Sequence, residues 1–230
     1  MSKLLFEPPA PVSVDISGTD VRFPVNRIFC VGRNYAAHVR EMGFDPAREA
    51  PCYFTKASRS IVASGSEIPY PPATENLHHE IELVVAIGIA GFELAVDTAL
   101  SVVYGYACGL DMTRRDLQVA SRENKGPWDI GKDFENSAVI SAIRPADEIG
   151  HPASGRIRLS VNGELRQDAD LEDLIWSVPE IVSHLSRYYR LEAGDLVYTG
   201  TPDGVGPVRP GDRIAGSIAG VGEIALAIRA

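Results

Sequence analysis

One stretch of the sequence, residues 76–89, constrains the fold more than any other. It reads Asn-Leu-His-His-Glu-Ile-Glu-Leu-Val-Val-Ala-Ile-Gly-Ile, so an apolar run follows two closely spaced acidic residues. Acidic and apolar residues alternate at its start, which predicts a strand that enters a hydrophobic core. Side chains alternate between the faces of a strand, so Glu80 and Glu82 point the same way, about 7 Å apart. The stretch therefore predicts a core strand with two carboxylates side by side near one end.

Two neighbouring carboxylates repel each other unless a positive group lies between them. This stretch alone leaves two interpretations open: a solvated edge strand with surface glutamates, or a metal site. A third oxygen ligand would decide, and Asp111 follows a strand predicted at Tyr104–Leu110. Three carboxylates without a cysteine suit Mg²⁺, Mn²⁺ or Ca²⁺ better than zinc. His78 and His79 are adjacent and face opposite ways in a strand, so at most one could join, and we expect both to be structural.

Composition excludes some classes of protein. The 230 residues are 45% hydrophobic and 23% charged, which is ordinary for one large globular domain. The net charge of −9, without a lysine-arginine block, argues against nucleic acid as a partner. No apolar leader and no run of membrane-spanning length are present, so we expect no membrane partner. Cys30, Cys52 and Cys108 are too few and too widely spaced for a disulfide framework or a zinc site, which predicts buried thiols in the cytoplasm.

The rest of the pattern predicts many short strands and few helices. Asn162-Gly163, between two strand patterns, is the strongest hairpin signal because Asn-Gly suits a type I′ turn. Without a regular β-α repeat, the expected fold is mixed and mainly β (α+β), with an N-terminal extension over residues 1–24 and a single domain over 25–230. Further strands are expected at Val12–Ile16, Arg27–Val31, Cys52–Lys56, Val139–Ile143, Asp195–Thr199 and within Asp212–Ile228; helices at Ala36–Met42, Val96–Val103, from Met112 onward and from Ser177 to about Tyr189; and a loop over residues 45–51.

His38 and Glu41 lie three residues apart in the short helix predicted at Ala36–Met42, so they share one face. They are either polar groups on a surface helix or an imidazole oriented by a carboxylate, which could act as a general base. The glycine-rich run Thr199–Gly206 matches neither a P-loop nor a dinucleotide fingerprint. It predicts a tight turn that places threonine hydroxyls near a ligand. No G-x-S-x-G motif is present, which argues against acyl-serine chemistry.

Five segments, taken together and in this order, give the sequence a specific resemblance. Together they resemble the fumarylacetoacetate hydrolase family, in particular its small single-domain acylpyruvate hydrolase branch, over roughly residues 27–228. The family likeness implies a compact mixed β fold, with short flanking helices, that commonly dimerises. The segments are Val31-Gly32-Arg33-Asn34-Tyr35-Ala36-Ala37-His38, Asn76–Leu83, Leu110-Asp111-Met112-Thr113, Val161-Asn162-Gly163-Glu164 and Thr199-Gly200-Thr201-Pro202-Asp203-Gly204-Val205-Gly206.

The resemblance also implies roles for individual residues. It implies one Mg²⁺ or Mn²⁺ ion bound by two glutamates and one aspartate, here Glu80, Glu82 and Asp111. It implies a water-activating dyad on a segment that orders over the site, here His38 and Glu41. It implies an enolate-stabilising lysine, here Lys132, and a threonine in the glycine-rich loop, here Thr201. It also implies two residues that contact the oxalyl-like end of the ligand, here Arg115 and Gln118.

This set of roles implies a hydrolase that cleaves the C3–C4 bond of a 2,4-dioxo acid into pyruvate and a carboxylic acid. The expected partner is a small anionic 2-oxo acid, with fumarylpyruvate from aromatic degradation as first choice, and a homodimer is expected. Alternatives are an oxaloacetate decarboxylase, a hydratase or isomerase of 2-oxo-dienoic acids, and a divalent-ion-binding protein without catalysis. The last would need neither His38 and Glu41 nor Lys132.

One departure from the branch pattern bears on substrate choice. A lysine followed by proline is common in the branch, whereas this chain has Lys56 followed by Ala57. Fumarylpyruvate carries a second carboxylate at its far end, and a buried carboxylate needs a cationic partner such as arginine. We expect Arg59, in this divergent loop, to bind that distal carboxylate. Arg33 and Arg40, which flank the His38 segment, are the competing candidates.

Overall fold

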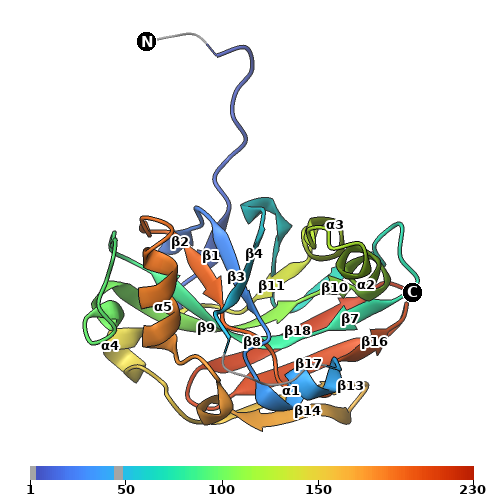
Figure 1. Cartoon of the computed structure of the whole chain (residues 1–230). Coiled ribbons are helices and arrows are strands. Elements are labelled where there is room, and N and C mark those ends of the chain that lie inside the picture. The colour runs from blue at the N-terminus through green and yellow to red at the C-terminus, as the bar shows by residue number, and fades with distance from the viewer. Residues whose placement is uncertain (1–3, 44–48) are drawn as a thin grey trace.

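A curled sheet of eight strands forms the centre of the structure (Figure 1). The computed structural model describes residues 4–43 and 49–230. Most neighbours in this sheet are antiparallel, but β15 pairs with β3, and β11 with β5, in parallel. The strands follow the order β4 (Cys52–Lys56), β3 (Ile28–Gly32), β15 (Leu196–Tyr198), β8 (Ile81–Ile87), β9 (Val103–Asp111), β11 (Ala138–Ile140) and β5 (Ile61–Ala63), and β12 (Arg144–Pro145) pairs with β9 beside this path.

A second sheet of five strands packs against one face of the first and encloses the larger hydrophobic core. Ile81, Leu83 and Val85 of β8 belong to this core together with Leu159 and Ile214 of the second sheet. The alternation predicted from the sequence therefore directs every second residue of β8 into this core. The order of the second sheet is β14 (Glu164–Asp170), β13 (Arg156–Val161), β17 (Arg213–Ile218), β18 (Gly222–Ile228) and β6 (Ser66–Ile68).

The other face of β8 contributes to a second, smaller core. Val84 and Ala86 pack there with Cys30 and Tyr198 of neighbouring strands. Glu82 lies on the same face by alternation, so this apolar row ends in a carboxylate. Glu82 thus reaches the interior because it continues a buried row of the sheet.

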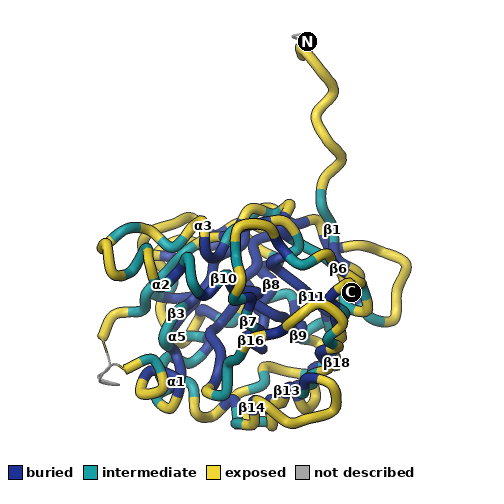
Figure 2. Tube along the Cα trace, turned by 90° about the vertical axis from the view of Figure 1, so that its right-hand side faces the viewer, coloured by how far each residue is buried: buried dark blue, intermediate teal, exposed yellow. Residues whose placement is uncertain are grey.

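The N-terminal extension divides into two parts. Strands β1 (Ser13–Asp15) and β2 (Arg22–Pro24) form a two-stranded sheet whose apolar side chains join the smaller core. The segment before it leaves the body and is exposed, as the yellow tube in Figure 2 shows. Among the described residues, 4–11 are therefore the part that is separate from the packed structure, since Val12 packs against the smaller core and its carbonyl accepts a 2.9 Å hydrogen bond from the backbone N–H of Val25.

A small sheet and short helices surround the start of β8, where Glu80 and Glu82 lie (Figure 1). Glu80 lies at the junction of β7 and β8 rather than inside a strand. The small sheet has the order β10 (Thr113–Arg114), β7 (Leu77–His79) and β16 (Gly206–Val208). The α-helices are α1 (Ala36–Glu41), α2 (Arg115–Glu123), α3 (Asp129–Lys132), α4 (Ala146–Ile149) and α5 (Val178–Ser186), and the 3₁₀ helices are η1 (Ser58–Ser60), η2 (Ala99–Val102) and η3 (Leu171–Asp173).

Most predicted elements are present, with shifted ends. The hairpin turn is confirmed, since Asn162 and Gly163 have φ of 53° and 82°, as a type I′ turn requires. Helix α5 begins with a capping box at Ser177, with a proline in its first turn. Residues 44–48, which include most of the loop predicted at 45–51, lie outside the described residues. Among the described residues, no helix is both long and apolar enough to cross a membrane.

The prediction of a helix at Val96–Val103 is wrong. Only Ala99–Val102 form a 3₁₀ helix, and Val103 already belongs to β9, where it pairs with Ile87. The hydroxyl of Ser101 donates to the carbonyl of Thr98 at 2.7 Å. Serine and threonine hydroxyls that bond to nearby backbone groups compete with helical hydrogen bonds. The end of the segment is extended because Val103 pairs with Ile87 of β8.

Candidate metal and substrate site

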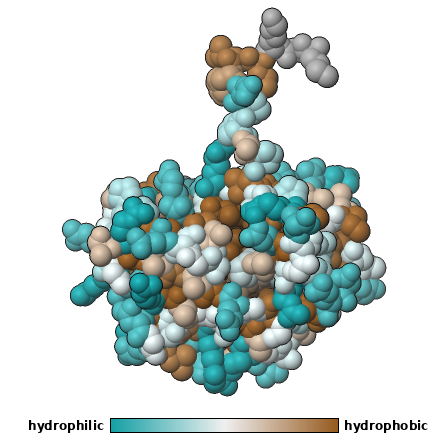
Figure 3. Space-filling model, turned by 180° about the vertical axis from the view of Figure 1, so that it is seen from behind, coloured by the Kyte–Doolittle hydropathy of each residue, from teal (hydrophilic) through white to brown (hydrophobic). Residues whose placement is uncertain are grey.

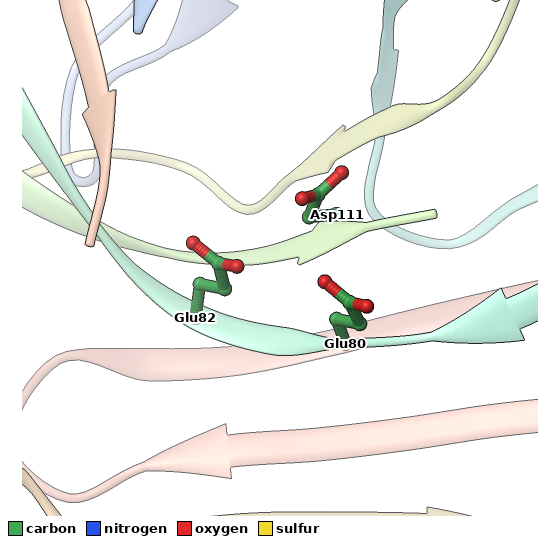
Figure 4. Close-up of side chains that lie close together, drawn as sticks. All are labelled: Glu80, Glu82 and Asp111. Carbon is green, nitrogen blue, oxygen red and sulfur yellow. The ribbon is translucent and has the colours of Figure 1, made fainter. Parts of the chain in front are cut away.

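Three buried carboxylates meet where β8 begins and β9 ends (Figure 4). One ligand atom from each of Glu80, Glu82 and Asp111 lies within 4.8 Å of the others. Glu82 pairs with Gly109 in the antiparallel register, so Asp111, two residues further along β9, is on the same face as Glu82. A Cβ at Gly109 would lie 2.5 Å from a methyl group of Val84, so glycine keeps this face closely packed.

Three buried cations surround this triad. Lys132 of α3 donates from Nζ to Glu80 Oε2 at 2.7 Å and to Asp111 Oδ2 at 2.6 Å. Arg115, the first residue of α2, forms an ion pair with Glu80. Lys56 Nζ, at the end of β4, lies 2.8 Å from Asp111 Oδ1. The two lysines and the arginine offset much of the repulsion among the carboxylates.

The three carboxylates are not electrostatically equivalent. Burial alone would raise the pKa of Glu80, but Lys132 and Arg115 hold that pKa well below its usual value. Burial and the neighbouring carboxylates of Asp111 and Glu80 raise the pKa of Glu82 well above its usual value. Among the described residues, Glu82 forms no ion pair, and its Oε2 accepts a 2.7 Å hydrogen bond from the backbone N–H of Gly200. Glu82 is therefore the carboxylate that most needs another positive charge.

The donor set fits a hard divalent cation. Asp111 Oδ1 is buried and, despite the nearby Lys56, accepts no hydrogen bond in the described part of the chain. Together with the unpaired charge of Glu82, this leaves oxygen ligands from two strands available to an ion. Carboxylate oxygens without sulfur or imidazole match the preference of Mg²⁺ and Mn²⁺. Glu80, Glu82 and Asp111 are the residues that would hold such an ion.

His38 and Glu41 form the pair predicted from their spacing. His38 Nδ1 lies 3.0 Å from Glu41 Oε2, and Glu41 Oε1 accepts a 3.0 Å hydrogen bond from the backbone N–H of Gly204. Burial alone would raise the pKa of Glu41, but the bonds from His38 and Gly204 hold it below its usual value. The imidazole is buried and lines the same pocket as the acidic triad. Because Glu41 occupies Nδ1, Nε2 is the ring nitrogen left to accept a proton.

The glycine-rich loop after β15 holds both parts of the site. Gly200 has φ of +99°, and a Cβ there would lie 2.7 Å from the Cβ of Asn34, so only glycine fits without a shift. Asn34 donates from Nδ2 to the carbonyl of Thr199 at 2.8 Å. The backbone N–H groups of Gly200 and Gly204 then reach Glu82 and Glu41 respectively. The predicted tight turn is present, and its backbone contacts the two carboxylates directly.

One pocket contains most of the predicted site residues. Gln118, Thr201 and Arg33 line it, and the guanidinium of Arg33 lies 5.8 Å from the ring centroid of Trp128. The residues that line it are Val31, Gly32, Arg33, His38, Met42, Phe54, Glu80, Glu82, Asp111, Arg115, Gln118, Val119, Arg122, Trp128, Lys132 and Thr201.

Some predicted residues lie elsewhere. Arg59, in η1, and Arg40, exposed on α1, are absent from the pocket lining. His78 and His79 are half-buried and buried respectively, and neither belongs to the acidic cluster, in agreement with a structural role. Burial and the charge of Arg115 lower the pKa of His78 to about 4, so this imidazole is neutral at ordinary pH.

Three residues of the site escaped the sequence argument. Lys56 was placed only at a strand end, although a buried lysine at that position requires an acidic partner such as Asp111. Arg122 follows Arg115 at a spacing of seven, which on a helix indicates the same face. Trp128 has no local signal, since it lies in the loop before α3 and reaches the pocket through tertiary packing.

The sequence matches the family described as "Fumarylacetoacetate (FAA) hydrolase C-terminal" over residues 27–229, so the chain belongs to this family. It is 49% identical to fumarylpyruvate hydrolase of Ralstonia sp over 184 residues, which cover 80% of this chain and 95% of that relative. It is 44% identical to the mitochondrial oxaloacetate tautomerase of Homo sapiens over 194 residues, covering 84% and 87% of the two chains. The family resemblance inferred from the five sequence segments is confirmed.

Solved structures agree with this assignment. A crystal structure of fumarylpyruvate hydrolase from Pseudomonas aeruginosa, in complex with Mn²⁺ and pyruvate, has a TM-score of 0.96 and 54% identity, and 99% of each chain is covered. A structure of a putative fumarylpyruvate hydrolase from Burkholderia cenocepacia has a TM-score of 0.93 and 46% identity, covering 100% of this chain and 96% of that one. The predicted fold, mainly β with short flanking helices, is confirmed.

Proposed function

We propose that this chain is a divalent-metal-dependent hydrolase of acylpyruvates, with fumarylpyruvate as the first candidate substrate. The observation that carries the proposal is that the acidic triad, Lys132 and His38 line one pocket, and that Nδ1 of His38 lies 3.0 Å from Oε2 of Glu41. Binding of a metal alone would require neither the base nor the buried lysine. The relatives with the same fold include a fumarylpyruvate hydrolase and a Mn²⁺–pyruvate complex of another, which supports this choice of substrate class.

The metal and Lys132 would serve the pyruvate half of the substrate. A bound Mg²⁺ or Mn²⁺ ion supplies Lewis-acid stabilisation of negative charge on the 2-oxo acid. Lys132 adds an ammonium group at the same position, and its neighbours Asp111 and Glu80 raise its pKa despite the opposing effect of burial. Charged groups fixed in a water-poor pocket stabilise a developing oxyanion more strongly than they would in water. Lys132 therefore helps pyruvate to leave as its enolate.

The His38–Glu41 pair would activate the attacking water. Glu41 orients the imidazole through Nδ1, and Nε2 takes a proton from a water that attacks the C4 carbonyl of the substrate. The C3–C4 bond then breaks, the acyl group leaves as a carboxylic acid, and the enolate carbon is protonated to give pyruvate. A positioned general base typically contributes a factor of about 10²–10⁴ in rate.

Arg115 and Gln118 would bind the carboxylate end of the pyruvate half. They are hydrogen-bonded to each other on the first turn of α2, and both side chains are buried in the pocket wall. Arginine presents a planar set of donors that matches a carboxylate. Thr201 lines the same pocket, and its Oγ1 accepts a 2.8 Å hydrogen bond from Nε2 of Gln167.

Oxaloacetate is the competing substrate, because relatives at 44% identity are oxaloacetate tautomerases. Tautomerisation of oxaloacetate would use the same 2-oxo acid site, and so would its decarboxylation, the alternative that the sequence left open. Neither reaction needs a water that attacks C4. A panel of acetylpyruvate, fumarylpyruvate and oxaloacetate, each with Mg²⁺, Mn²⁺ or EDTA, separates these activities. The proposal expects metal-dependent pyruvate release from the acylpyruvates to exceed that from oxaloacetate. Conversion of oxaloacetate alone would overturn it.

We also propose a homodimer, a cytoplasmic location and a role in aromatic compound degradation, the last because fumarylpyruvate belongs to that chemistry. Support for association comes from Leu4, Leu5 and Phe6, which are 69%, 95% and 74% exposed. They lie on the segment that leaves the body, seen as brown atoms at the top of Figure 3. Light scattering on the purified protein tests the dimer: a mass of one chain at micromolar concentration contradicts it.

A further inference from the structure

Helix α2 forms one wall of the pocket along its whole length. Arg115, Gln118, Val119 and Arg122 all line the pocket, at spacings of three, four and seven residues from the first. These spacings place the four side chains on a single face of an α-helix. Arg115 is buried against Glu80, whereas Arg122 is half-buried. The face therefore runs from the acidic triad towards the mouth of the pocket, with an arginine at each end.

The two arginines are separated by a distance that suits a particular ligand length. Seven residues of helix rise about 10 Å. A seven-carbon chain spans about 8 Å between its terminal carbons, given bonds of about 1.5 Å. A 2-oxo acid of this length, with its 2-oxo end at Arg115 and the metal site, would bring its last carbon within reach of Arg122.

The outer part of the pocket has the composition that a charged chain end requires. Among the described residues that line the pocket, every acidic one belongs to the triad. Val119, which lies between Arg115 and Arg122 on this face of α2, and Met42 contribute apolar surface to the pocket. An apolar middle and a cationic end match a hydrocarbon chain that ends in a carboxylate.

We propose that Arg122 binds the distal carboxylate of the substrate and so selects seven-carbon 2-oxo dicarboxylates over 2-oxo monocarboxylates. This rests on the proposed function for the identity of the reaction. The assignment differs from the one made on sequence alone, because Arg59 does not line the pocket. Arg33 does line it, but its guanidinium lies over the ring of Trp128 rather than on the α2 face.

The test uses two ligands that differ only at the far end. 2-Oxoheptanedioate and 2-oxoheptanoate have seven carbons each and lack the 4-oxo group, so neither is cleaved. Their affinities are measured by calorimetry in Mn²⁺ for the wild type, Arg122→Met and Arg122→Lys. Arg229→Met, on an exposed arginine that pairs with Glu67, is the matched control. Arg33→Met and Arg59→Met test the two competing assignments.

The wild type should bind the dicarboxylate at least about tenfold more tightly, the effect of one charge-assisted hydrogen bond. Arg122→Met should remove that preference and leave the monocarboxylate unchanged, Arg122→Lys should retain part of it, and Arg229→Met all of it. Equal weakening of both ligands in Arg122→Met, or loss of the preference in Arg33→Met or Arg59→Met instead, overturns the inference. Pyruvate release from fumarylpyruvate is measured separately, so a wild type that shows the binding preference without cleavage refutes the proposed reaction and not the role of Arg122.

Discussion

The backbone N–H of Gly200 donates a 2.7 Å hydrogen bond to Oε2 of Glu82, across 118 residues of sequence. The same turn is fixed by Thr199, whose hydroxyl donates to the carbonyl of Leu83 at 3.0 Å. The glycine-rich loop is thus attached to the strand that carries the carboxylate. Its conformation determines where one of the three proposed metal ligands lies.

Gly200→Ala should therefore affect both stability and metal binding. The residue has φ of +99°, and the added Cβ would lie 2.7 Å from the Cβ of Asn34, so the turn must shift. We expect a loss of about 2 kcal/mol or more in the free energy of unfolding, measured by urea denaturation, and weaker Mn²⁺ binding. Gly211→Ala is the control, because φ is +93° there but no atom lies within 4 Å of the added Cβ. Equal losses in the two variants would contradict a tight contact at Gly200.

Glu82→Gln should weaken metal binding strongly. Glutamine keeps the size of the side chain and its bond to Gly200 but removes a negative charge from an all-oxygen site. We expect the affinity for Mn²⁺, measured by calorimetry, to fall at least about tenfold, since one charge-assisted contact is lost, and pyruvate release nearly to vanish. Glu223→Gln, on an exposed face of β18, should change neither. An active, EDTA-sensitive Glu82→Gln enzyme at wild-type metal concentration would show that the ligand assignment is wrong.

His38→Ala should separate hydrolysis from metal-assisted chemistry. The variant loses the proposed base but keeps the triad and Lys132, so acetylpyruvate hydrolysis should fall about 10²–10⁴-fold. Any activity towards oxaloacetate that needs no water at C4 should survive. Glu41→Gln removes the orienting charge while leaving the imidazole, and should give a smaller loss in hydrolysis. If His38→Ala reduces acetylpyruvate hydrolysis and oxaloacetate conversion equally, water activation is not its role, and the histidine instead carries out a proton transfer that both reactions require.

Lys132→Met should make stability depend on metal. Without the ammonium group, the carboxylates of Glu80 and Asp111 lose a buried partner at 2.7 and 2.6 Å. Breaking a buried pair from one side typically costs about 3–5 kcal/mol. Thermal unfolding should therefore show a lower Tm in EDTA, and Mn²⁺ should raise that Tm more in the variant than in the wild type. Lys125→Met, in an exposed loop, is the control. If Mn²⁺ raises the Tm equally in the wild type, Lys132→Met and Lys125→Met, then Lys132 and the metal do not share the carboxylates of Glu80 and Asp111.

The sequence was sufficient for features that depend on local pattern. Alternation along residues 80–87 predicted the shared face of Glu80 and Glu82, and the end of the next strand predicted the place of Asp111; the structure brings all three together. The spacing of His38 and Glu41 likewise predicted a shared helix face, and the structure places Nδ1 of His38 3.0 Å from Oε2 of Glu41. In each case one element, or two adjacent strands, sets the geometry.

Features that depend on strand order or on packing could not be predicted in this way. Lys56 reaches Asp111 although β4 and β9 are not neighbours in the sheet, so this contact depends on how the sheet curls. Arg59 was chosen because it lies in a divergent loop, but the direction of that loop relative to the pocket is a tertiary property. The helix expected at Val96–Val103 was overridden at its end by pairing between β8 and β9.

The most direct test of the central claim is the reaction of the purified protein with fumarylpyruvate in Mn²⁺, followed by quantification of both products. The proposed chemistry predicts pyruvate and fumarate in equal amounts, formation of both abolished by EDTA, and recovery when Mn²⁺ is restored. Acetylpyruvate should give pyruvate and acetate in the same ratio. Absence of pyruvate from every acylpyruvate in the presence of Mg²⁺ or Mn²⁺, or release that continues unchanged in EDTA, would contradict it.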